Sequence, residues 1–282
     1  MKKMKSRKVR RKTKRVFMKL GTCSRTLFYI LNREFVYPLE NEERAVDLLA
    51  GGILQQGYQC GMLWGGACAL GAESYRRCSD RERAIGITIK ATRHVMESFI
   101  NRTKSPDCSE ITSCDWSNKW SIAKYMFSGK FWGCLKLAEK WAPEAVESAI
   151  EGLTLDQTDV PEQPISCASE VVRKMGATDA EMVMVSGFAG GFGLSGDGCG
   201  ALSAAIWMNT LARVRKQNFK ASFSDPVTEK ILIAFYEGTG YEMECHKITG
   251  KRFKTIADHT EFIKNGGCDT LIKVLADASS VP

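Results

Sequence analysis

Two stretches of the chain match each other around a glycine-rich segment that ends in a cysteine. The first is Ala50-Gly-Gly-Ile-Leu-Gln-Gln-Gly-Tyr-Gln-Cys-Gly-Met-Leu63, and the second is Ala189-Gly-Gly-Phe-Gly-Leu-Ser-Gly-Asp-Gly-Cys-Gly-Ala-Leu202. Seven of the fourteen positions are identical without a gap, and they include four glycines and the cysteine. Such self-similarity predicts an internal duplication in which each copy builds the same structure.

Three further cysteines extend the match on both sides of this segment. Successive cysteines are separated by 37, 48 and 26 positions in the first half and by 32, 46 and 23 in the second. Four cysteines that recur in the same order at similar spacing favour duplication over chance. The pairs are Cys23 with Cys167, Cys60 with Cys199, Cys108 with Cys245, and Cys134 with Cys268.

Hydrophobic periodicity predicts a mainly α fold of two tandem helical domains related by this duplication. In each domain a glycine-rich loop leads into the N-terminus of a helix that bears a cysteine, where free N–H groups favour a thiolate. A segment with Pro161 and Pro164 and no apolar face separates the copies. The predicted parts are a basic flexible tail over 1–15, a first domain over 16–150, a linker over 151–166 and a second domain over 167–282.

The composition is that of a soluble globular protein, since 44% of the 282 residues are hydrophobic and 26% are charged. No uninterrupted apolar run of about 18 residues occurs, so we expect no transmembrane segment. No secretory signal is visible either, which predicts a cytoplasmic protein. Eleven cysteines in that compartment favour reduced thiols, metal binding or redox work over a disulfide scaffold.

The formal net charge of +8 is unevenly distributed along the chain. Residues 1–20 hold eleven Lys or Arg and no acid, whereas the rest carries 29 basic and 32 acidic residues. We therefore expect weak, salt-sensitive contact with an anionic polymer or a membrane surface through residues 1–15.

With these cysteines in view, the chain resembles the C-GCAxxG-C-C redox-active family, as two tandem copies. In that family the second of four cysteines opens a Cys-Gly-Ala-x-x-Gly motif. The second copy here reads Cys199-Gly-Ala-Leu-Ser-Ala204, so the last glycine is replaced, and the first reads Cys60-Gly-Met-Leu-Trp-Gly65, so the alanine is lost. The resemblance implies redox activity at the paired cysteines. Covalent haem is not expected, because Cys-x-x-Cys-His is absent.

Several chemistries suit such a quartet. Four thiolates can hold an iron–sulfur cluster or structural zinc, and two pairs can cycle between dithiol and disulfide. Our main hypothesis is an iron–sulfur protein that passes electrons to an unidentified electron-transfer protein. The alternatives are a metal-free thiol–disulfide oxidoreductase or redox sensor, and a non-redox helical interaction module whose basic tail docks nucleic acid or membrane. The expected cofactor-binding residues are Cys23, Cys60, Cys108 and Cys134, and Cys167, Cys199, Cys245 and Cys268.

Other signals carry less weight. Cys68, Cys78 and Cys114 have no cysteine partner in the other half, so we expect packed or idle thiols. The Gly191–Gly196 stretch matches Gly-x-Gly-x-x-Gly but lacks the βαβ context of a dinucleotide site, so its glycines are expected to shape the approach to Cys199. His246 is expected at the surface.

Overall fold

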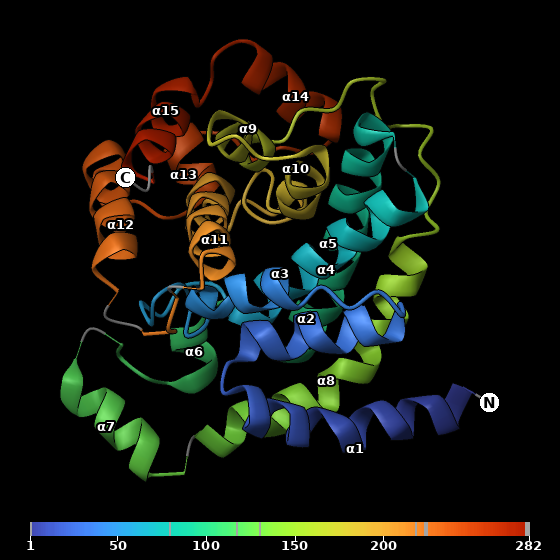
Figure 1. Ribbon diagram of the computed structural model, residues 1–282, viewed down its shortest axis with the longest axis vertical. Coiled ribbons are helices and arrows are strands. Elements are labelled where there is room, and N and C mark those ends of the chain that lie inside the picture. Colours follow the sequence, from blue (N-terminus) through green and yellow to red (C-terminus); the bar gives the residue numbers. More distant parts are fainter. Residues whose placement is uncertain are drawn as a thin grey trace.

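The computed structural model describes residues 2–78, 80–116, 118–129, 131–217, 219–222 and 225–279. Within these ranges the chain forms α-helices, one short 3-10 helix and no strand, which confirms the predicted mainly α class (Figure 1). Met1 and residues 280–282, which the predicted parts of the chain include, lie outside the described residues.

The two halves present their elements in the same order. The first half contains α2 (Cys23–Glu34), α3 (Glu40–Ala45), the 3-10 helix η1 (Asp47–Leu49), α4 (Gly61–Arg77), α5 (Arg81–Thr103), α6 (Cys108–Thr112), α7 (Lys119–Phe127) and α8 (Phe131–Gly152). The second contains α9 (Cys167–Lys174), α10 (Asp179–Ser186), α11 (Gly200–Arg215), α12 (Pro226–Thr239), α13 (Cys245–Thr249), α14 (Ile256–Lys264) and α15 (Asp269–Ala278).

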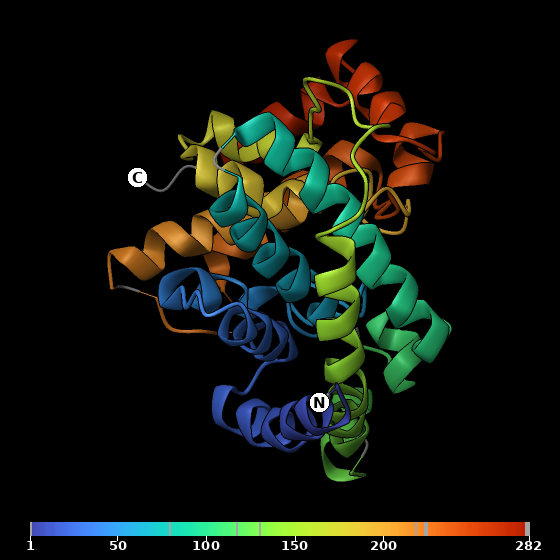
Figure 2. The same ribbon diagram turned by 90° about the vertical axis from the view of Figure 1, so that its right-hand side faces the viewer.

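The N-terminal segment differs from the predicted flexible tail. Residues Lys2–Leu20 form a helix, α1, which packs on α8 and α2 (Figure 2). Val9, Thr13, Val16 and Phe17 are buried, and their spacing of about one turn places them on one face. The many basic residues of this segment predict a solvated tail, but the few side chains on this face are enough for the helix to pack.

Helices of the two halves pack against each other. Helix α10 of the second half packs on α4 of the first, and α3 of the first half packs on α11 of the second. At the α4–α10 crossing a Cβ on Gly71 would lie 2.4 Å from the carbonyl oxygen of Val183, so only glycine permits this approach. One continuous hydrophobic core therefore includes side chains from both halves.

Aromatic packing reinforces this shared core. The Trp64 ring of α4 makes edge contacts with Phe188 and Phe192 of the second half, at centroid distances of 4.9 and 5.0 Å. No helix within the described ranges is long and apolar enough to cross a membrane.

Candidate redox site

The loop before the second cysteine of each half has an unusual left-handed backbone. Five consecutive residues in each copy, 51–55 and 190–194, have φ between +49° and +80°, and the glycine two positions later also has a positive φ, +82° at Gly57 and +88° at Gly196. Leu54 and the β-branched Ile53 are among them, although this region normally costs about 1–2 kcal/mol for a residue with a Cβ. We call residues 51–57 and 190–196 the left-handed loops.

The two left-handed loops are also closed by the same hydrogen bonds. The N–H of Gly57 donates to the carbonyl of Gly51 at 3.0 Å, and Gly196 donates to Gly190 at the same distance. The bonds from Leu54 to Leu48 and from Gly193 to Gly187 are both 2.8 Å. Because unrelated sequences would not share this pattern, the duplication extends to the backbone of the site.

The first cysteine of each half begins a helix under its left-handed loop. Cys23 and Cys167 are the first residues of α2 and α9. The N–H of Gly51 donates to Cys23, and that of the equivalent Gly190 donates to Cys167. The loops therefore present backbone donors to one sulfur in each half.

The second cysteine lies at the other end of the loop. Cys60 and Cys199 are the N-cap residues of α4 and α11, as the sequence predicts. The N–H groups of Met62 and Ala201, both in the first turn, donate to these sulfurs. A Cβ on Gly61 would lie 2.8 Å from the Cys23 sulfur, so the glycine after Cys60 leaves room for that atom.

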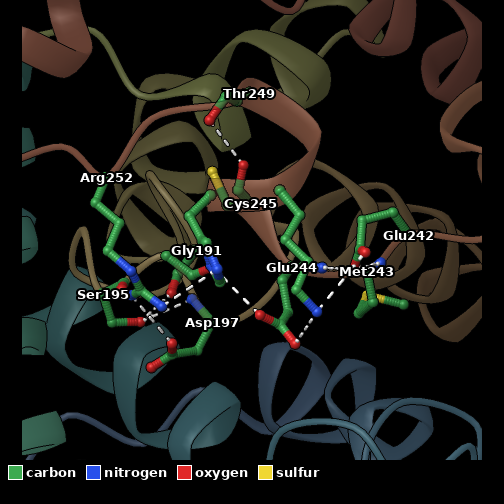
Figure 3. A network of polar contacts seen from close by, with 12 residues as sticks. Gly191, Ser195, Asp197, Glu242, Met243, Glu244, Cys245, Thr249 and Arg252 are labelled. Carbon is green, nitrogen blue, oxygen red and sulfur yellow. Dashed lines mark hydrogen bonds and ion pairs between the residues drawn. The ribbon is translucent and has the colours of Figure 1, made fainter.

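The third cysteine is fixed by short helices that contact the loops. Cys108 and Cys245 are the first residues of α6 and α13. In the second half, the N–H of His246 donates to the carbonyl of Gly196 at 3.1 Å, and Arg252 donates to the Ser195 carbonyl and pairs with Asp197 (Figure 3). The α13 segment is thereby held against the second left-handed loop.

The fourth cysteines occupy different helix positions. Cys268 caps α15, as predicted, whereas Cys134 lies inside α8, one turn after its start. In the first half the hydroxyl of Tyr125 lies 3.0 Å from the Cys134 sulfur. Tyr125 is buried on α7, and its role was not evident from the sequence because a lone tyrosine has no spacing signature.

The structure brings each quartet together. In the second half all six pairs among Cys167, Cys199, Cys245 and Cys268 are close enough to interact electrostatically. In the first half this holds for five pairs, including Cys23 with each of Cys60, Cys108 and Cys134. Cysteines that are more than 100 positions apart in the sequence thus lie near one another in each half.

The first half contains one activated thiol. A hydrogen bond from Cys60 is the largest cause, and together with N–H donors from Gly51 and Ser24 it lowers the pKa of Cys23 to about 7 despite burial. The same contact and burial raise the pKa of Cys60 well above its ordinary value. At neutral pH Cys23 therefore has substantial thiolate character, and Cys60 acts as its donor.

None of the four cysteines that the structure describes in the second half has a lowered pKa. Burial raises the pKa of Cys199 to about 12 and also raises that of Cys167, whose hydrogen bonds from backbone N–H groups oppose the shift. Burial likewise raises the pKa of Cys245 and Cys268 far above the ordinary range. The second quartet is therefore neutral unless a positive charge is brought to it.

The quartets do not form a ready-made site for a single metal ion. In the described residues no group of three or more His, Cys, Asp or Glu side chains is placed to hold a metal ion as it stands. Thiolates around one zinc lie about 3.8 Å apart, whereas those around a cluster lie about 6–7 Å apart.

The two sites lie next to each other. The Gln59 amide donates to Asp107 at 3.1 Å and also to the carbonyl of Asp197. A Cβ on Gly198 would lie 2.4 Å from the Gln59 Oε1. Because Gln59 and Gly198 directly precede Cys60 and Cys199, the segments that lead into the second cysteine of each half contact each other.

The remaining cysteines differ in their surroundings. Cys68 is fully buried in α4, and burial alone raises its pKa well above the ordinary value. Cys78 ends α4, and its sulfur lies 3.9 Å from the Asp80 carbonyl. Cys114 is buried and interacts electrostatically with Cys108, so it lies beside the first quartet. His246 is partly covered by Gly196 and Arg252 rather than free at the surface.

Comparison with known proteins agrees with this duplicated architecture. The chain matches no curated protein and no solved structure. One family model, described as "Putative redox-active protein (C_GCAxxG_C_C)", matches it twice, over residues 22–147 and 165–279. The two matches contain the two quartets and meet near the predicted linker. The chain therefore belongs to this C_GCAxxG_C_C family, of which it carries two tandem copies.

Proposed function

We propose that each half binds an iron–sulfur cluster through its four cysteines and that the protein transfers electrons. The observation that carries this proposal is the convergence of four thiols in both halves, including the half that has no activated thiol pair. A disulfide needs only two sulfurs, whereas a cluster uses four. When bound, such a cluster accepts and releases electrons one at a time.

The residues of the chain have definite roles in this proposal. The N–H groups of Gly51 and Gly190 stabilise negative charge on the first cysteine of each quartet. Tyr125 does the same at Cys134. Burial of Cys60, Cys108 and their counterparts excludes water, which strengthens these contacts.

The redox partner is then a separate electron-transfer protein. The contact between the segments that precede Cys60 and Cys199 would allow one half to exchange electrons with such a partner and the other half to store them. Eleven cysteines suit a reducing compartment, and we place this activity in the cytoplasm.

A second candidate function rests on one contact in the first half. Cys23 and Cys60 are hydrogen-bonded, and Cys23 is the more acidic partner. Such a pair can release two protons and two electrons and form a disulfide, which would make the first half a thiol–disulfide oxidoreductase or redox sensor. The non-redox interaction module has no comparable support at the cysteine sites.

Anaerobic purification tests these functions. We expect a coloured protein with visible absorption from thiolate-ligated iron, and equal amounts of iron and acid-labile sulfide. A colourless, iron-free protein whose thiol count falls by two on mild oxidation would support the Cys23–Cys60 pair instead. A protein with neither iron nor oxidisable thiols would contradict both.

A further inference from the structure

One end of the molecule exposes large aromatic side chains. Trp120 and Phe127 of α7 are 85% and 92% exposed, and Trp132 at the start of α8 is 50% exposed. Trp120 and Phe127 are seven positions apart, so they lie two turns apart on one face of the helix. The opposite face of α7 carries Tyr125, which contacts Cys134. Helix α7 therefore binds the first site with one face and presents aromatics with the other.

The second half provides an internal control for this exposure. Helix α14 begins 11 positions after Cys245, as α7 begins 11 positions after Cys108. Counted in this way, Trp120 and Phe127 correspond to Ala257 and Lys264, which are also exposed. The duplicated fold thus leaves these positions in solvent in both halves but does not require aromatic residues there.

Helix α1 adds positive charge beside these aromatics. The Nζ of Lys14 lies 5.2 Å from the centre of the Trp132 ring, and Phe17 makes an edge contact with Phe131 at 5.9 Å. Met18 of α1 is 56% exposed. Helices α1 and α7 lie at the same end of the molecule in both views (Figures 1 and 2). The second half begins at α9 and has no counterpart of α1 in the described residues.

We propose that this end of the protein, formed by α1, α7 and the start of α8, docks onto an anionic phospholipid bilayer. Trp120, Phe127, Trp132 and Met18 would enter the headgroup region, and Lys12, Lys14 and Lys19 of α1 together with Lys124 of α7 would face lipid phosphates. Tryptophan and lysine together are typical of helices that lie at a membrane interface. Docking would orient the first quartet toward the membrane.

The observations favour a bilayer over an acidic protein or a nucleic acid. Basic residues occur along the sequence of α1, a helix of about 28 Å, and Trp120 and Phe127 project from α7 into solvent. Lys124 lies one turn from both Trp120 and Phe127, so charge and apolar area alternate over the face. A broad, flat surface of negative charge with an apolar layer beneath matches this arrangement.

Vesicle binding of the full chain tests the proposal. The probe is a vesicle of equal parts phosphatidylglycerol and phosphatidylcholine, compared with pure phosphatidylcholine, in a flotation assay. The test variant is Trp120→Ala/Phe127→Ala, and the matched control is Ile233→Ala/Tyr241→Ala, which removes exposed apolar side chains from the second half. We expect binding only to the anionic vesicles, and about tenfold weaker binding of the test variant. The control should bind as the wild type does.

A second readout locates the contact. Brominated lipid should quench Trp120 and Trp132 fluorescence, while the fully buried Trp64, Trp141 and Trp207 stay unquenched. The test variant should keep the wild-type melting temperature, since Trp120 and Phe127 are exposed. Equal vesicle binding of test variant and wild type would overturn the proposal, as would tighter binding to single-stranded RNA than to the anionic vesicles.

Discussion

The two cysteine sites share a backbone but differ in how closely their first two sulfurs approach. Cys60 hydrogen-bonds to Cys23 in the first half, whereas the interaction between Cys199 and Cys167 is electrostatic. The left-handed loops, the helix positions of the first three cysteines and the N–H groups donated to the first two are equivalent in the two halves. The shared backbone therefore builds both sites, and the contact between the first two sulfurs determines how they differ in acidity.

The helix that follows the second cysteine explains the difference. A Cβ on Gly65 would lie 1.9 Å from the carbonyl oxygen of Ser24, so α2 approaches α4 only because Gly65 has none. The equivalent residue of α11 is Ala204, which is buried and carries that Cβ. The backbone of α9 cannot approach α11 at this position as α2 approaches α4. We infer that this methyl group is the reason why only the first pair of thiols is hydrogen-bonded.

The largest expected effect comes from replacing Gly65 by alanine, the residue found at the equivalent position 204 of the second half. Gly65→Ala should destabilise the protein by about 2–4 kcal/mol, because backbone must move to admit the methyl. It should also move the Cys23 sulfur away from the Cys60 sulfur and break their hydrogen bond. Urea unfolding measures the first effect. Gly133→Ala is the control, since a Cβ there meets nothing within 4 Å, and it should be neutral or stabilising. Equal stability of the two variants would refute the explanation from Gly65.

The next effect is a dependence of folding stability on pH that comes from Asp47 in the first half. Burial is the main cause that raises the pKa of Asp47 to about 6, and the equivalent residue, Ser186, does not titrate. Between pH about 4 and 6 the unfolded state loses a proton that the folded state keeps. Stability should therefore fall as pH rises through this window, by on the order of 2–3 kcal/mol for Asp47.

Denaturation curves between pH 4 and 7 measure this slope. Asp47→Asn should reduce it, while the part due to Asp107, whose pKa burial also raises to about 6, remains. An unchanged slope in Asp47→Asn would mean that Asp47 titrates normally in the folded protein.

Thiol reactivity gives a smaller contrast. In metal-free protein at pH 7, Cys23 should react with iodoacetamide about tenfold faster than Cys167, because only Cys23 is a thiolate in part. Peptide mass spectrometry resolves the two sites. Cys60→Ala should slow Cys23, since it removes the hydrogen bond that lowers its pKa. Comparable rates at Cys23 and Cys167 would argue that the halves are chemically alike.

The smallest effect concerns the fourth cysteine. Counted from the third cysteine, Tyr125 corresponds to Phe262, so Tyr125→Phe gives the first half the residue of the second. Loss of one hydrogen bond of about 1 kcal/mol should make the first-half reduction potential about 40 mV more negative for one electron. A redox titration of iron-loaded protein should show one of two waves shifting. A shift of both waves, or of neither, would contradict a role confined to Cys134.

Much of the fold could be predicted from sequence because duplication leaves a pattern that periodicity alone does not. The glycines at 51–52 and 190–191 marked the loops, and the helical class followed from apolar spacing. The left-handed conformation of Ile53 and Leu54 could not be predicted, since these side chains normally avoid it. It is imposed by tertiary contacts and by the glycines around it.

The remaining differences have the same origin. Helix α1 could not be predicted because Val9, Thr13 and Phe17 are outnumbered by basic residues in this segment. These side chains are buried only because α1 packs on α8. Contacts between the halves, such as Gln59 with Asp107 and Asp197, depend on how the copies associate. A repeat in the sequence does not encode that arrangement.

Iron and acid-labile sulfide per chain, measured in anaerobically purified wild type, Cys60→Ser and Cys199→Ser, test the central claim most directly. If each half holds its own cluster, each of these two variants should retain about half of the wild-type iron and sulfide and all of its helical content. The control Cys78→Ser should retain all of the iron and all of the sulfide. Iron that survives in full in both variants, disappears entirely in either one, or is absent from the wild type would contradict a four-cysteine cluster in each half.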